Sequence, residues 1–150
     1  MKNSKSRSKS GISLVEFAAA LALGLPLLIT ILYVTLEASY YFSIRTNIDI
    51  AARNAARGLA IEYGKDPTIA SSPTGPKVQA VFTKNHIPGF VNNNNQFGTP
   101  TFDNAVSPGT VTVVCTYTGG SYGLPLFPNP DPLNLGSSFK VISSATFATE

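Results

Sequence analysis

The chain has 150 residues, of which 43% are hydrophobic and 13% are charged, with 11 Lys and Arg against 8 Asp and Glu. This length is enough for one modest domain. Four of the cationic residues lie in the first eleven positions, which hold no acidic residue, so residues 12–150 carry 7 positive against 8 negative side chains. The near-neutral body argues against a nucleic-acid-binding face, which needs clustered Lys and Arg on a folded surface.

Chemistry that depends on metals or cofactors is also disfavoured. A single cysteine, Cys115, excludes an intramolecular disulfide framework, and a single histidine, His86, leaves too few ligands for a zinc site. The sequence has no phosphate-binding loop, no Ser/His/Asp arrangement, and no paired acids at helical spacing in a plausible cleft. We therefore expect no enzyme activity, no cofactor, no metal and no small-molecule substrate, and we interpret His86 as a turn residue.

Residues 12–36 form an apolar run of twenty-five residues in which Glu16 is the only charged one. Twenty uncharged residues separate Glu16 from Glu37, and as an α-helix they span about 30 Å, the thickness of the hydrocarbon core of a bilayer. The run predicts a transmembrane helix in contact with lipid. The basic residues before it place residues 1–11 in the cytoplasm and the rest of the chain on the outer side.

Three fates are open to such an N-terminus. A secretory signal peptide could be cut after Ala20, but the apolar run continues for sixteen residues beyond that point. A plain uncleaved anchor accounts for the apolar run and the leader but not for Glu16, because a carboxylate inside an apolar segment is costly. The third fate is cleavage at Gly11, which closes the leader and is followed by Ile12-Ser13-Leu14-Val15-Glu16-Phe17.

This junction resembles the type IV prepilin signature, in which cleavage after a glycine leaves a glutamate at the fifth mature position. More narrowly, the chain resembles the TadE family of minor pilins, or pseudopilins, of Tad (tight adherence) pili. The resemblance is carried by the junction, by Leu25-Pro26-Leu27-Leu28, by Glu37 at the end of the apolar run, by the Ala-Ala-Arg repeat of residues 51–57 and, more weakly, by residues 143–147. One departure is Ile12, where other type IV pilins commonly have phenylalanine.

The resemblance implies how the protein is processed, where it is located and which partners it has. Gly11 would be the last leader residue, Ile12 the new, N-methylated terminus made by a prepilin peptidase, and Glu16 the glutamate used in assembly. It implies a bacterial inner-membrane protein whose partners are other pilin subunits and the pilus platform. Physically, the freed amine on Ile12 is disfavoured at the edge of the hydrocarbon unless a carboxylate such as Glu16 of a neighbouring subunit compensates it.

The helix is predicted to continue beyond the membrane as an amphipathic periplasmic segment, residues 37–64, that ends near Tyr63. Apolar residues recur there at spacings of three and four, and a polar strip at i, i+4 offers local ion pairs. Gly64 and Pro67 supply a stop, and Pro26 predicts a kink within the membrane. The apolar positions are Ile44, Ile48, Ala51, Ala52, Ala55 and Leu59, and the polar ones are Arg45, Asp49, Arg53 and Arg57.

Residues 65–150 hold ten of the eleven prolines and predict a small β-rich domain. We expect a short helix beginning at Pro76, a polar loop over residues 92–96, a hairpin of residues 101–106 and 110–118 turning at 107–109, and a final strand over residues 139–147. Alternation in the second hairpin strand places Cys115 in the core, with an intersubunit or redox role as the alternative. The Pro-rich loop of residues 119–136, with its exposed-looking Tyr122 and Phe127, is either a subunit contact, a surface-presented loop or a cover over the sheet.

Two or three strands cannot fold alone, so their apolar face must pack on the outer half of the long helix. The predicted fold is therefore α+β, a pilin-like lollipop: a long N-terminal transmembrane and spine helix packed by a small antiparallel β-sheet. Two other functions stay open. The chain could be a membrane-anchored binding or adhesion protein that never polymerises, or a pseudopilin of type II secretion.

Overall fold

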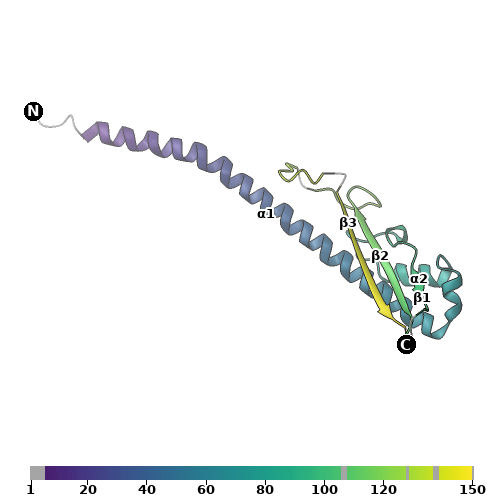
Figure 1. Ribbon diagram of the computed structural model, residues 1–150. Coiled ribbons are helices and arrows are strands. Elements are labelled where there is room, and N and C mark those ends of the chain that lie inside the picture. Colours follow the sequence, from purple (N-terminus) through teal and green to yellow (C-terminus); the bar gives the residue numbers. More distant parts are fainter. Residues whose placement is uncertain (1–5, 106–107, 128, 137–138, 150) are drawn as a thin grey trace, which may run out of the picture.

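The computed structural model describes residues 6–105, 108–127, 129–136 and 139–149. Helix α1 (Ser6–Lys65) is followed by the 3-10 helix η1 (Pro67–Ser71), helix α2 (Pro76–Lys84), the 3-10 helix η2 (Asn94–Gln96) and three strands, β1 (Thr101–Asp103), β2 (Thr110–Thr118) and β3 (Lys140–Ala148). The strands form one antiparallel sheet in the order β1-β2-β3. Figure 1 shows α1 as a long rod whose far half carries all the other elements.

Helix α1 has 60 residues, which corresponds to a length of about 90 Å. It starts at Ser6, earlier than the predicted start near Ile12, and it ends at Lys65, close to the predicted end. The earlier start follows from the cooperativity of helices, because extending an existing helix through residues without proline adds one hydrogen bond for each residue that is fixed. Asp66 then leaves the helix and caps η1, and Pro67 follows in its first turn.

The sheet has the predicted alternation. Val111, Val113, Cys115 and Tyr117 are fully buried, whereas the residues between them are half-buried. Strand β2 pairs with β3 along its whole length, with Val111 opposite Phe147 and Tyr117 opposite Val141. Strand β1 is shorter than predicted and stops at Asp103; Val106 and Ser107 of the expected hairpin lie outside the described residues.

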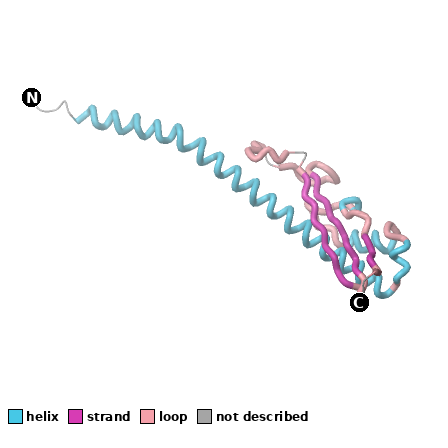
Figure 2. The backbone as a smooth tube through the Cα atoms, viewed as in Figure 1, coloured by secondary structure: helices cyan, strands magenta, loops and turns pink. Residues whose placement is uncertain are grey.

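The core lies between α1 and the sheet, where the inner face of β2 and β3 packs on one stripe of the helix. Figure 2 shows the strands running alongside the outer half of α1. This arrangement confirms the predicted α+β architecture and the predicted apolar stripe. The buried stripe consists of Ile44, Ile48, Ala51, Ala52, Ala55, Ala56, Leu59 and Ala60.

Helix α2 forms where the sequence predicts a short helix, because Pro76 occupies its first turn and Val78 and Phe82 share one face. Phe82 stacks on Phe97, with 4.6 Å between the ring centroids. The polar loop expected over residues 92–96 is only partly correct, because it contains η2 and its Gln96 is buried. Gln96 accepts hydrogen bonds from the amides of Asn92 and Asn93 and donates to the carbonyl oxygens of Phe90 and Thr116, so it holds the loop against the sheet.

The loop of residues 119–136 covers the end of the sheet nearest the membrane-side half of α1. Phe127, which was expected to be exposed, is buried: its ring packs 5.1 Å from Tyr40 and 4.3 Å from Phe139 between ring centroids. The Tyr117 hydroxyl donates to the Pro125 carbonyl. Tyr122 is exposed, as expected. The contacts of Phe127 and Pro125 favour the interpretation of this loop as a cover over the sheet.

Candidate functional site

The first feature of the site is the inner half of α1. Every residue from 13 to 32 is exposed, and Leu23 keeps 80% of its surface accessible. Within the described part of the chain this is the one helix long and apolar enough to cross a membrane. A helix that is apolar on all sides and touches nothing else of its own chain needs lipid or other helices around it. This half of α1 is a membrane anchor.

Glu16 interrupts this apolar surface near its start. Its carboxylate is exposed and makes no hydrogen bond or ion pair within the described residues. Gly11 and Ile12 both belong to α1, so the helix runs without a break through the predicted cleavage junction and past Glu16. Glu16 is four residues beyond Ile12, which places the two residues about one helical turn apart on the same side of the helix.

Helix α1 continues through Pro26 without a break. Thr30 donates its hydroxyl hydrogen bond to the Pro26 carbonyl at 2.9 Å, and Thr35 donates to the Ile31 carbonyl at 2.8 Å. Both bonds join residues four apart, which is how threonine satisfies its hydroxyl inside lipid. The hydroxyl groups of these two threonines are therefore accommodated within the helix itself.

The second feature is Glu37, which the sequence marks only as the end of the apolar run. Its side chain is fully buried beneath the loop of residues 119–136. The amide of Leu133 donates to Glu37 Oε2 at 3.0 Å, whereas Oε1 has no partner among the described residues. The spacing of 37, 44 and 48 places Glu37 on the buried stripe, and this spacing is the signal that could have predicted its burial. Glu37 ties the covering loop to the base of the spine.

The polar strip on the outer half of α1 forms one of the two predicted ion pairs. Arg53 lies 2.9 Å from Asp49, which confirms that pair. Arg45 instead donates to the Tyr41 hydroxyl at 3.2 Å. The other Asp49 oxygen accepts a hydrogen bond from Ser143 of β3 at 2.9 Å. Sequence reasoning missed this link between helix and sheet, because the two residues are far apart along the chain.

Asp66 organises the turn at the end of the spine. Its carboxylate accepts hydrogen bonds from Lys77 of α2 and from the amide and hydroxyl of Thr68. The bond from Lys77, followed by those from Thr68, lowers the pKa of Asp66 from 3.8 to about 2. The same contact raises the pKa of Lys77. Asp66 therefore links the end of α1 to the start of α2.

The two residues considered for chemistry, Cys115 and His86, lie in different parts of the fold. Cys115 is fully buried in β2, as predicted, and its burial raises the pKa of its thiol to about 12. His86 lies just after α2, as expected of a turn residue, with its Nε2 2.7 Å from Asn94 Oδ1. Within the described ranges, no group of three or more His, Cys, Asp or Glu side chains could hold a metal ion.

The comparison with protein families places this geometry in context. Residues 11–57, which comprise the predicted cleavage junction, the anchor and most of the spine, match the model of the TadE-like protein family. The match ends before α2 and the sheet. No curated protein and no solved structure matches the chain. TadE-like proteins form a structural family related to the Tad pilus, whose members interact with other pilus components. The segment that forms the anchor and most of the spine is therefore similar to the TadE-like proteins of the Tad pilus system.

Proposed function

We propose that the protein is a structural minor pilin, or pseudopilin, made as a prepilin and used to assemble a Tad pilus for adhesion or secretion. A prepilin peptidase cleaves it between Gly11 and Ile12. Residues 1–11 are then the cytoplasmic leader, residues 12–36 the span of the inner membrane, residues 37–64 the periplasmic spine, and residues 65–150 the periplasmic or extracellular domain. The protein has no enzymatic role in this proposal.

One observation carries the proposal: the exposed apolar anchor has a single unpartnered carboxylate, Glu16, one helical turn beyond the junction. An ion in hydrocarbon is costly unless it is paired. Within the chain, the described residues offer Glu16 no partner. The freed amine of Ile12 on a neighbouring subunit has the opposite charge and the right depth in the membrane, so pairing would fix the axial register of adjacent helices.

The packing of the domain supports the proposal, because the domain leaves most of the anchor uncovered. Strands β2 and β3 pack on the outer half of α1, and residues 13–32 of the anchor stay exposed. The anchor can therefore leave lipid and pack against other helices without unfolding the domain. An adhesion protein that only needed a tether would not require this uncovered helix to carry a carboxylate near its start.

The proposal is tested by determining the N-terminus of the protein from membranes of cells with and without the host prepilin peptidase. Intact mass and the terminal peptide should show a start at Ile12, with or without one methyl group, only when the peptidase is present. A start at Met1 in both strains would indicate a plain anchored protein, and a start after Ala20 would indicate a secreted domain. Either result would overturn the proposal.

Assignment to the Tad pilus rather than type II secretion needs a second measurement. Sheared surface filaments from cells with each assembly system deleted in turn should contain the processed protein only when the Tad machinery is intact. Processed protein that depends instead on the type II secretion machinery would support the other assignment.

A further inference from the structure

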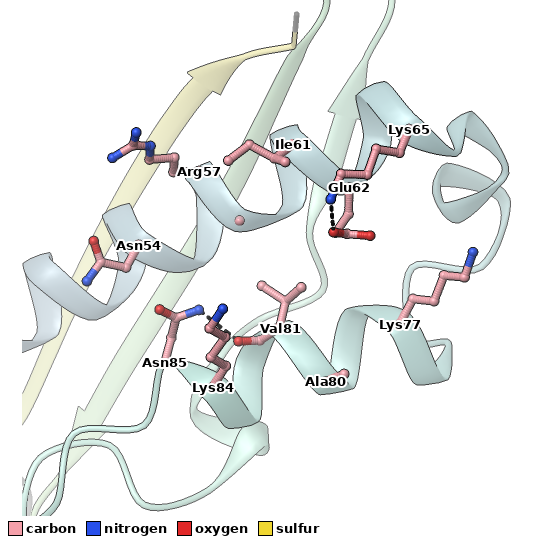
Figure 3. Close-up of a pocket in the computed structure, with 11 residues that line it drawn as sticks. Asn54, Arg57, Ile61, Glu62, Lys65, Lys77, Ala80, Val81, Lys84 and Asn85 are labelled. Atoms are coloured by element: carbon pink, nitrogen blue, oxygen red, sulfur yellow. Dashed lines mark hydrogen bonds and ion pairs between the residues drawn. The ribbon is translucent and has the colours of Figure 1, made fainter.

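The distal end of the domain carries a groove that the proposed function does not use. Its volume is about 540 Å³, and it lies between the end of α1 and α2. Figure 3 shows Lys77, Val81 and Lys84 projecting from α2 toward α1, and Glu62 projecting from α1 toward α2. The lining residues are Asn54, Arg57, Gly58, Ile61, Glu62 and Lys65 of α1, and Lys77, Ala80, Val81, Lys84 and Asn85 at α2.

The floor of the groove is aliphatic. Ile61, which keeps 49% of its surface exposed, lines the groove from α1, and Ala80 and Val81 line it from α2. A Cβ atom on Gly58 would lie 2.9 Å from Val81 Cγ1, so the absence of a side chain there lets α2 come close to α1. No aromatic side chain lines the groove. Nucleic-acid bases are held largely by stacking on aromatic rings, so this floor favours aliphatic side chains as its ligand.

The rim of the groove is basic. Lys65 is paired with Glu62 at 2.8 Å, and Lys77 is paired with Asp66. Arg57 on α1 and Lys84 on α2 have no acidic partner among the described residues and are both exposed. The charge is also concentrated along the chain: residues 53–86 hold five Lys and Arg against two Asp and Glu, whereas residues 87–150 hold one against three.

The dimensions suit a short stretch of extended peptide. From Asn54 to Lys65 the lining of α1 advances eleven residues, or about 17 Å along the helix axis. Extended chain advances about 3.3 Å per residue, so the groove accommodates about five residues. Alternating acidic and aliphatic side chains on such a segment would point to the basic rim and to the aliphatic floor in turn.

We propose that this groove binds an acidic, aliphatic peptide segment of a partner protein, with Arg57 and Lys84 contacting its carboxylates and Ile61 and Val81 contacting its apolar side chains. The proposal goes beyond the assembly function, because the binding needs neither cleavage nor a pilus. It can therefore fail while the assembly function holds, and the reverse is also true.

The test uses the full chain in detergent micelles and a fluorescein-labelled peptide of alternating Glu and Leu. Fluorescence anisotropy should show saturable binding that weakens with salt. The double variant Arg57→Gln/Lys84→Gln should raise Kd about tenfold. The matched double variant Arg45→Gln/Lys140→Gln removes the same charges outside the groove and should leave Kd unchanged. Equal weakening by both variants would show diffuse attraction by net charge and would overturn the proposal.

The aliphatic floor is tested separately. Ile61→Ser should weaken binding, whereas Ile142→Ser, which removes an exposed isoleucine on β3, should not. A peptide with Ser in place of Leu should bind less well, and one with Lys in place of Glu should not bind. If the Ser peptide or a nucleic acid bound as tightly as the Glu-Leu peptide, the groove would be a simple anion site and the proposal would be wrong.

A second copy of the chain is the other possible occupant. Sedimentation of the peptide-free protein distinguishes it, because self-association through the groove would be lost in Arg57→Gln/Lys84→Gln and kept in Arg45→Gln/Lys140→Gln. That pattern would overturn the proposal in favour of a contact between copies. A monodisperse protein that binds the Glu-Leu peptide supports it.

Discussion

The two halves of α1 differ in how much of their apolar surface the rest of the chain covers. Residues 13–32 are exposed on every side, whereas the outer half buries a continuous stripe that includes Ile48 and Leu59. The inner half is apolar all round, so nothing in its pattern selects a face for its own chain to cover. The outer half alternates apolar and polar positions at helical spacing, so it selects one face for the sheet. A helix that is apolar on all sides is typical of contact with lipid, whereas apolar residues at helical spacing are typical of a helix that packs on a core.

The glutamates that bound the anchor show the same contrast. Glu16 is exposed and has no partner within the described residues, whereas Glu37 is buried and accepts a hydrogen bond from Leu133. In the proposed function the carboxylate of Glu16 pairs with another subunit, whereas the carboxylate of Glu37 stabilises the fold of its own chain.

The sharpest test compares two isoleucines on the same helix. Ile48 is fully buried and Ile50 is 44% exposed. Ile48→Asp places an unpaired charge in the core and should destabilise the domain by about 4 kcal/mol. Ile50→Asp should change stability by less than about 0.5 kcal/mol. Urea unfolding in micelles, followed by tyrosine near-UV circular dichroism, measures both variants. Equal losses would show that the stripe does not set the stability of the domain.

Glu37→Ala should destabilise the protein by about 2 kcal/mol, because it leaves a cavity and removes the acceptor of the Leu133 amide. The effect should be local, so hydrogen exchange at Leu133 should accelerate more than exchange in β2. Glu37→Gln keeps an oxygen acceptor at the same place and should show a smaller change. Unchanged exchange at Leu133 in the alanine variant would mean that the loop is held by its aromatic contacts alone.

The turn at Asp66 predicts a dependence on acid. The pKa of Asp66 is lowered, so its contacts with Lys77 and Thr68 stabilise the fold above the ordinary pKa of 3.8 and are lost as the pH falls toward about 2. The midpoint of unfolding should therefore fall over this range in the wild type and change less in Asp66→Asn. Asp103→Asn, at an exposed carboxylate without a lysine partner, is the control. An identical acid dependence in Asp66→Asn and the wild type would exclude this role.

Removal of the charge on Glu16 should hardly change the stability of the domain. Glu16→Gln should leave unfolding of the domain unchanged within about 0.5 kcal/mol, because the carboxylate contacts no described part of the chain. Membrane insertion and cleavage should also continue, whereas the amount of protein in sheared filaments should fall strongly. Glu62→Gln makes the same chemical change at the distal end of α1 and should assemble normally. Wild-type incorporation of Glu16→Gln would remove the basis for pairing with Ile12.

The sequence predicts those features of the fold that depend on local periodicity. The stripe at Ile44 and Ile48, the alternation around Cys115 and the helix starting at Pro76 each follow from spacing within a few residues. The burial of Phe127 could not be predicted, because its partner Tyr40 lies 87 positions away in the sequence and the loop that carries it has no period. The hydrogen bond between Leu133 and Glu37 could not be predicted for the same reason, because it depends on where a Pro-rich loop returns to the helix.

The candidate site also has one part that the sequence predicts and one part that it does not. Gly11, Ile12 and Glu16 lie within six residues of the sequence, so a local motif identifies them, and their roles belong to the proposed function. The distal groove brings Arg57 together with Lys84, which belong to different helices. It exists because η1 turns the chain back and Gly58 lets α2 approach. Neither the basic rim nor the aliphatic floor can be recognised from residue spacing along the chain.

Because α1 is one unbroken helix, it fixes the angle around its axis between Glu16 and the domain. Each residue turns the helix by about 100°, so the direction in which the domain leans is coupled to the direction in which Glu16 points. Inserting one residue between Glu16 and Glu37 would swing the domain by about 100° around the axis while lifting it by only about 1.5 Å. Inserting seven would nearly restore the direction but raise the domain by about 10 Å. Insertions of different length in this one helix would therefore change the direction of the domain and its height above the membrane separately.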